Sequence, residues 1–301
     1  MSKFILSAIA IGFFSMAALA QQPDDTRDLW DTAFKQKRPV GNKSVKRTAP
    51  VRYRLVSKSK ATRPVDSASY TAVVGVTVWR LRPSKATDDT EVRQLIHEQG
   101  EWTPERVGGG SPLTEGSRVQ LTIESPRAGY LYVFDREIYA NKTYGEPYLI
   151  FPTLNLNGGD NKVSAGRVIE IPSSEDKPAY YTLKRSRTDH DGEALTVIVS
   201  DKPLLDLTIG RSALKVSAEQ FDKYEKKWGA LTQQLELDSG AGTAMSKSEK
   251  AAASGKEDLT QDDSLPQTIY RVLAKPDQPL LVTVPLSIGK QSPAAKENRN
   301  P

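Results

Sequence analysis

Cysteine is absent from the 301 residues, and histidine occurs only twice. Without cysteine the chain has no disulfide framework, no thiolate ligand, no cysteine nucleophile and no N-terminal cysteine for a lipid anchor. Two histidines also exclude a multi-histidine metal centre. The sequence therefore predicts no metal site and no cofactor, and it assigns no catalytic residue.

Apolar residues are few: they make up 38% of the chain, and the mean hydropathy is −0.50. This is little for one compact globule of this length, so part of the chain is expected to lie outside a packed core. Segment 238–265 consists mainly of Ser, Ala, Gly, Lys and acidic residues and predicts a disordered linker. The tail, residues 290–301, is predicted to be disordered as well.

One long apolar run is present, at residues 4–19. It follows Lys3 and ends within the small-x-small triplet Ala18-Leu19-Ala20. This order is typical of a secretory signal peptide, which we place at residues 1–20. A membrane anchor is the alternative, but the run is shorter than the roughly 20 residues of a membrane span. We expect cleavage near Gln21 and a periplasmic or secreted protein with no transmembrane segment in the mature chain.

Acidic residues are missing from segment 32–65, which holds eleven basic ones. The rest of the mature chain has 30 basic and 37 acidic residues, a charge of −7. Residues 21–68 therefore predict a basic, largely extended arm with a short helix around Trp30. Its densest basic positions are candidate contacts for an anionic envelope surface or an envelope protein. They are Lys43, Lys46, Arg47, Arg52 and Arg54.

Two other interpretations of the arm stay open: a solvated linker, or a segment that lies on the acidic body of the same protein. Nucleic acid is not expected as a partner, because export removes the usual substrate. Aromatic residues are also sparse here, with only Tyr53 available for base stacking.

The body shows the patterns of an all-β protein. Segments 74–78 and 119–124 alternate apolar and other residues, as strands do, and 119–124 predicts a strand with one solvated face. Segment 130–134 is apolar on both faces, which suits a central strand. Short strands with Gly, Pro, Asn and Asp turns between them predict a mainly β, antiparallel β-sandwich, immunoglobulin-like or similar, over residues 69–237. Residues 266–289 predict a returning β-hairpin.

One amphipathic helix is expected after the sandwich. Ser217 and Gln220 form a capping-box pattern at its start, and Gly240 is its expected stop. Large apolar residues then recur at spacings of three and four, which places them on one helix face. This face packs on the body or binds a partner, and its residues are Phe221, Tyr224, Trp228, Leu231 and Leu235.

Several short motifs carry a family resemblance. The run at 113–135 reads LTEGSRVQLTIESPRAGYLYVFD, and LIFP at 149–152, AG at 165–166, IP at 171–172 and VIVSDKP at 197–203 follow in order. Together, across residues 79–205, they resemble an uncharacterised bacterial family, domain of unknown function 4384. The resemblance implies an exported, stand-alone member without a fused catalytic domain, and it transfers no catalytic residue.

Candidate chemistry is sparse. His97 and His190 lack a Gly-x-Ser-x-Gly elbow, and residues 189–192 are expected to form a hairpin turn. The oxygen-rich loop 155–161 lacks the downstream Glu of an EF-hand, so it too predicts a turn. We therefore expect a non-catalytic exported envelope protein that acts as a binding or accessory module. The alternatives are an exported hydrolase with a dispersed site, or a calcium- or carbohydrate-binding sandwich.

Overall fold

The computed structural model describes residues 36–41, 52–58, 70–96, 100–108, 111–275 and 277–289. The expected signal peptide, the short helix around Trp30 and the tail at 290–301 lie outside these residues. His97 and the basic positions Lys43, Lys46 and Arg47 lie outside them as well.

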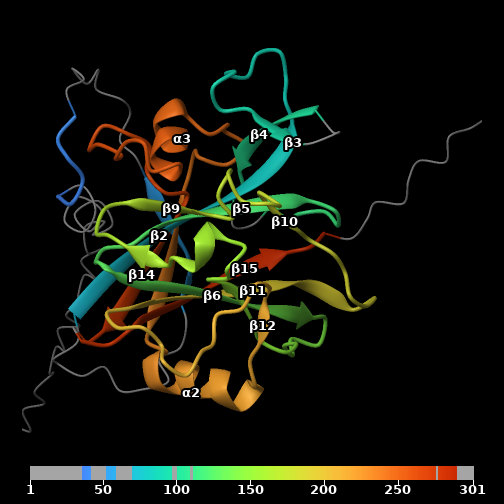
Figure 1. Cartoon of the computed structure of the whole chain (residues 1–301), viewed down its shortest axis with the longest axis vertical. Coiled ribbons are helices and arrows are strands. Elements are labelled where there is room, and N and C mark those ends of the chain that lie inside the picture. Colours follow the sequence, from blue (N-terminus) through green and yellow to red (C-terminus); the bar gives the residue numbers. More distant parts are fainter. Residues whose placement is uncertain are drawn as a thin grey trace, which may run out of the picture.

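The described strands form two antiparallel sheets, and this confirms the expected mainly β, sandwich-like fold (Figure 1). The main path of the larger sheet is, in order, β1 (Tyr53–Lys58), β13 (Thr232–Leu237), β14 (Thr268–Ala274), β2 (Tyr70–Pro83), β4 (Gly100–Arg106) and β3 (Gln94–Ile96). Strand β5 (Arg118–Glu124) pairs with the other edge of β2. Strands β9 (Val168–Ile171) and β10 (Tyr181–Thr182) both pair with β5. The smaller sheet runs β12 (Leu214–Lys215), β7 (Tyr148–Phe151), β6 (Gly129–Tyr139), β11 (His190–Ser200), β15 (Leu280–Ser287), with β8 (Lys162–Val163) also on β6.

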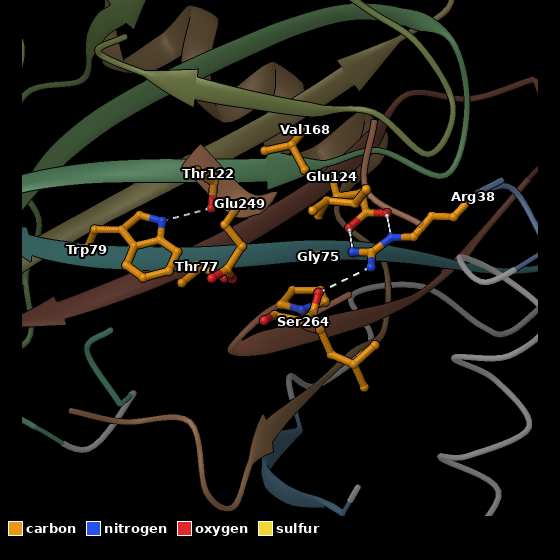
Figure 2. A pocket seen from close by; sticks show the side chains of 12 residues that line it. Arg38, Gly75, Thr77, Trp79, Thr122, Glu124, Val168, Glu249 and Ser264 are labelled. Carbon is orange, nitrogen blue, oxygen red and sulfur yellow. Dashed lines mark hydrogen bonds and ion pairs between the residues drawn. The ribbon is translucent and has the colours of Figure 1, made fainter. Parts of the chain in front are cut away.

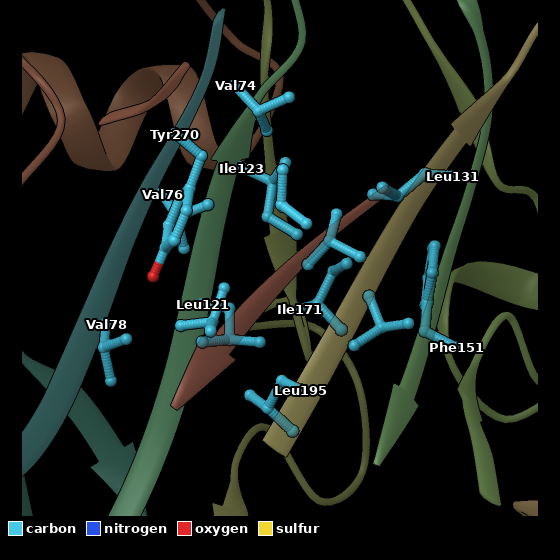
Figure 3. Packing of buried hydrophobic residues seen from close by; sticks show 14 of the residues in the cluster. Val74, Val76, Val78, Leu121, Ile123, Leu131, Phe151, Ile171, Leu195 and Tyr270 are labelled. Atoms are coloured by element: carbon cyan, nitrogen blue, oxygen red, sulfur yellow. The ribbon is translucent and has the colours of Figure 1, made fainter. Parts of the chain in front are cut away.

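The main core lies between the two sheets, where alternate side chains of facing strands meet. Strand β2 contributes Val74 and Val76 from one sheet, and β6 contributes Leu131 from the other (Figure 3). Because side chains alternate, the neighbouring residues of β6 point to the opposite face, where Phe134 is buried in a second cluster. This explains why segment 130–134 is apolar on both faces.

Helix α2 (Ala218–Trp228) covers the outer face of the smaller sheet and lies at one end of the molecule (Figure 1). The Ser217 hydroxyl caps its first turn, as the sequence predicts, by accepting the Gln220 N–H at 3.1 Å. The helix is shorter than expected, because it ends at Gly229. Leu231 and Leu235 are therefore not on its face, and Leu235 lies on β13 between β1 and β14.

The prediction of a disordered linker at 238–265 is wrong. This segment contains helix α3 (Lys247–Ala253) and packs on the larger sheet. A capping box of Ser246 and Glu249 starts the helix, and Glu249 also forms a buried ion pair with Arg106. Lys250 lies 3.8 Å from the buried carboxylate of Glu170 on β9. Ion pairs with residues distant in the sequence therefore order segment 238–265, which has few apolar side chains to bury.

The expected hairpin at 266–289 is also corrected. Both strands exist, as β14 and β15, but they are not paired with each other. Strand β14 pairs with β13 and β2, while β15 pairs with β11 in the other sheet. The connection therefore crosses between the layers, from β14 in the interior of the larger sheet to β15 at the edge of the smaller one.

Candidate functional site

Segment 203–207 and the exposed side of α2 form a concave surface that opens to solvent. We call it the α2 groove; it encloses about 750 Å³ and is lined by residues 203–206 and by α2 side chains between Lys223 and Trp228. This volume lies within the range of small-ligand sites. The surface is open to solvent on one side, so it could also receive a larger partner.

Hydrogen bonds to Tyr132, Tyr224 and Gln220 fix segment 203–207 in place. The Leu204 N–H donates to the Tyr132 hydroxyl oxygen at 2.9 Å, and the Tyr224 hydroxyl donates to the Asp206 carboxylate at 2.7 Å. Gln220 Nε2 also donates to that carboxylate at 3.1 Å. Between these anchors Leu205 stands 92% exposed. The protein thus holds a large apolar side chain in water on an ordered segment.

The floor of the α2 groove is aromatic. The rings of Tyr224 and Trp228 stack with centroids 4.9 Å apart and planes 7° apart. Burial, followed by the hydrogen bond to Asp206, raises the pKa of the Tyr224 hydroxyl, so it stays protonated and donates. Phe221, by contrast, is fully buried against Phe134, with ring centroids 5.3 Å apart. The predicted helix face therefore both packs on the body and lines the groove.

The rim of the α2 groove is cationic. Its charged lining residues are Lys223, Lys226 and Lys227 together with Asp206, whose carboxylate already accepts two hydrogen bonds. Lys223 forms an exposed ion pair with Glu219 at 3.1 Å, and Lys227 Nζ lies 5.5 Å from the Trp228 ring centroid. Exposed ion pairs of this kind contribute little and exchange readily. The groove therefore favours an anionic partner with an apolar part.

Sequence reasoning did not select Leu205 or the three lysines. The available signal was a pair of leucines directly after Pro203, together with the polar side of the predicted helix. Sequence alone does not show that the two segments are neighbours, because the hydrogen bond between Tyr224 and Asp206 creates that contact.

The described parts of the basic arm lie against the body. Arg54 is 68% exposed on the edge strand β1 and lies 3.7 Å from Glu236 and 3.6 Å from Asp238. Arg52 is exposed at the start of the same segment. Both belong to the predicted anionic-contact set, and the other members lie outside the described residues.

Arg38 is the arm residue most firmly bound to the body. It is 2% exposed and donates to both carboxylate oxygens of Glu124, at 2.9 and 2.6 Å (Figure 2). Its remaining donors reach the carbonyl oxygens of Thr260 and Ser264 at 3.3 and 3.2 Å. The adjoining cavity of about 20 Å³ holds one water molecule at most. This arrangement fits a structural clasp rather than a ligand site.

His190 is the first residue of β11. The turn expected at 189–192 therefore ends at Asp189, and residues 190–192 belong to the strand. The His190 ring is completely buried: Nδ1 accepts the Ser186 N–H at 3.2 Å, and Nε2 lies 2.9 Å from the Gly192 carbonyl oxygen. Around His190, the described residues do not form the solvent-open Ser-His-Asp arrangement that a hydrolase needs.

A carboxyl pair lies close to His190. Asp135 on β6 and Glu193 on β11 point to the same sheet face, and each carboxyl group influences the pKa of the other. One oxygen of each is buried and has no hydrogen-bond partner among the described residues. Burial raises the pKa of both carboxyl groups above their ordinary values, which favours the protonated form.

The loop around Asn157 is closed by its own hydrogen bonds. Asn157 Nδ2 donates to the Asp160 carbonyl at 2.8 Å, and its N–H donates to Asp176 at 2.9 Å. Within the described ranges, no three Asp, Glu or His side chains converge so that they could hold a metal ion. Likewise, no helix in that part of the chain is long and apolar enough to cross a membrane.

Comparison with protein-family models, curated proteins and solved structures finds no significant match to this chain.

Proposed function

We propose that the protein is a non-catalytic exported module of the cell envelope that binds an anionic partner through the α2 groove. The observation that carries the proposal is the juxtaposition of an exposed, anchored Leu205 with three lysines and a stacked aromatic floor. Export rests on the signal-peptide pattern at residues 1–20, and membership of the family named above stays a prediction.

The contrast between the two basic regions supports this choice of surface. Arg38 and Arg54 meet carboxylates of the protein's own body, so these arm charges are at least partly compensated. The lysines of the α2 groove lie on an exposed helix side next to Leu205, which nothing in the described chain covers. A single partner at this surface could therefore be attracted by the lysines and also bury the Leu205 side chain.

The test is co-sedimentation of the purified protein with envelope membranes isolated from its host, at physiological salt. Replacing Lys223, Lys226 and Lys227 with Glu should lower the apparent affinity at least about tenfold, since each lysine near an anionic surface contributes about 1 kcal/mol. A matched control reverses three exposed lysines elsewhere, Lys85, Lys162 and Lys184. This control has the same net charge and should retain most of the binding.

Two outcomes contradict the proposal. If the wild-type protein stays in the supernatant, the envelope holds no partner for it. If both triple variants lose binding equally, net charge rather than the α2 groove attracts the membranes.

A further inference from the structure

The α2 groove combines the residue types that interfacial membrane-binding segments use. Such segments place Leu, Trp or Tyr at the boundary between headgroups and acyl chains and keep Lys at the level of the phosphates. Here Leu205 projects from the rim, Lys226 and Lys227 occupy the exposed side of α2, and the largely buried rings of Tyr224 and Trp228 form the floor beneath them. The composition of the site thus matches an anionic bilayer.

The position of the groove allows contact with a flat surface. Helix α2 lies across one end of the long axis of the molecule, while β3 with the exposed Leu95 lies toward the opposite end (Figure 1). Segment 203–207 is already fixed by its bonds to Tyr132 and Tyr224, so little ordering entropy is lost when Leu205 enters a new environment.

Resting on the proposed function, the geometry points to an anionic phospholipid bilayer as the occupant of this surface. Leu205 inserts its side chain at the boundary between headgroups and acyl chains, and Lys223, Lys226 and Lys227 lie among the lipid phosphates. A projecting leucine on a protein partner needs a matching apolar pocket, whereas a bilayer closes around it. One inserted leucine with three lysines gives reversible binding that salt weakens.

The absence of cysteine makes a direct test simple. Leu205→Cys and the control Leu95→Cys each supply a single thiol for an environment-sensitive fluorophore; both positions are exposed, at 92% and 77%. The labelled proteins are mixed with vesicles of phosphatidylglycerol and phosphatidylcholine, or of phosphatidylcholine alone. We expect a blue shift and a rise in emission only for the label at 205 and only with the anionic vesicles.

A second measurement uses unlabelled protein and the same vesicles. Leu205→Asp should weaken sedimentation with anionic vesicles about tenfold or more, while Leu95→Asp should leave it unchanged. Because both leucines are exposed, the two variants should keep the wild-type melting temperature, which is checked in the same samples.

The outcomes separate this inference from the proposed function. If wild-type protein binds anionic vesicles while the label at 205 does not respond, or Leu205→Asp binds as well as wild type, another surface meets the bilayer and the inference is wrong. If the protein binds host envelope membranes through the three lysines but ignores phospholipid vesicles, the partner is an envelope protein or an acidic polysaccharide. The proposed function then stands, and the bilayer inference falls.

Discussion

At the scale of single residues, the buried carboxyl pair of Asp135 and Glu193 links stability to pH. The unfolded carboxyl groups lose their protons near pH 4, whereas burial raises the folded pKa of both above the ordinary value. Above the unfolded pKa the folded state therefore binds more protons than the unfolded state. The pair consequently lowers the free energy of unfolding as pH rises from acidic toward alkaline values.

Glu193→Gln should remove much of this dependence. The amide keeps an oxygen acceptor for His190 Nε2, which lies 3.2 Å from Glu193 Oε1, but it cannot ionise. We expect the variant to be more stable than wild type at pH 8 by roughly 1–3 kcal/mol, with a smaller difference at pH 5. Urea denaturation at both pH values measures this.

The control for that experiment is Glu137→Gln. Glu137 is the cross-strand partner of Glu193, but its side chain is about one-third exposed and accepts the Tyr139 hydroxyl at 2.7 Å. Its effect on the pH dependence should be small. A Glu193→Gln protein with the wild-type pH profile would show that the carboxyl pair does not link stability to pH.

At the scale of elements, α2 is held by its buried aromatic side. Trp228 stacks on Tyr224, and Tyr224 lies over Phe134 of β6 with centroids 6.0 Å apart. Trp228→Ala leaves a space that the sheet cannot fill, so we expect it to lower the free energy of unfolding by about 3–5 kcal/mol. Thermal and urea denaturation check the value.

Lys227→Ala, on the exposed side of the same helix, is the matched control and should change stability by no more than about 0.5 kcal/mol. An unchanged midpoint for Trp228→Ala would mean that the indole contributes nothing to packing. Its role would then be limited to the α2 groove.

At the scale of the whole molecule, Arg38 joins segments that are far apart in the chain. Its guanidinium connects the N-terminal arm to Glu124 on β5 and to the carbonyls of the segment after α3, up to 226 positions away. Arg38→Ala leaves Glu124, only 3% exposed, as an uncompensated buried charge. We expect a loss of about 3–5 kcal/mol in the free energy of unfolding.

Arg54→Ala serves as the comparison, because it removes an arginine of the same arm whose side chain is 68% exposed and whose ion-pair distances are long. Its cost should be about 1 kcal/mol or less. Equal effects of the two substitutions would contradict the distinction between a buried clasp and a surface contact. Differential scanning calorimetry of both variants decides the question.

Local pattern was sufficient for several features of the fold. The alternation around Val76 and Ile123 and the two apolar faces at 130–134 predicted strands that the structure confirms, because side-chain period is a property of neighbouring residues. The Ser217 cap was predictable for the same reason, since its partner is only three residues away.

Only the tertiary structure decided how these elements meet. Leu235 fits the helix period as well as the strand period, and pairing with β1 and β14 assigns it to a strand. Segment 238–265 is ordered by ion pairs such as Arg106 with Glu249, 143 positions apart, which no local window contains. The α2 groove likewise depends on bringing segment 203–207 onto a helix. Contacts between residues distant in sequence choose among states that local propensity leaves nearly equal in free energy, and these contacts exist only after folding.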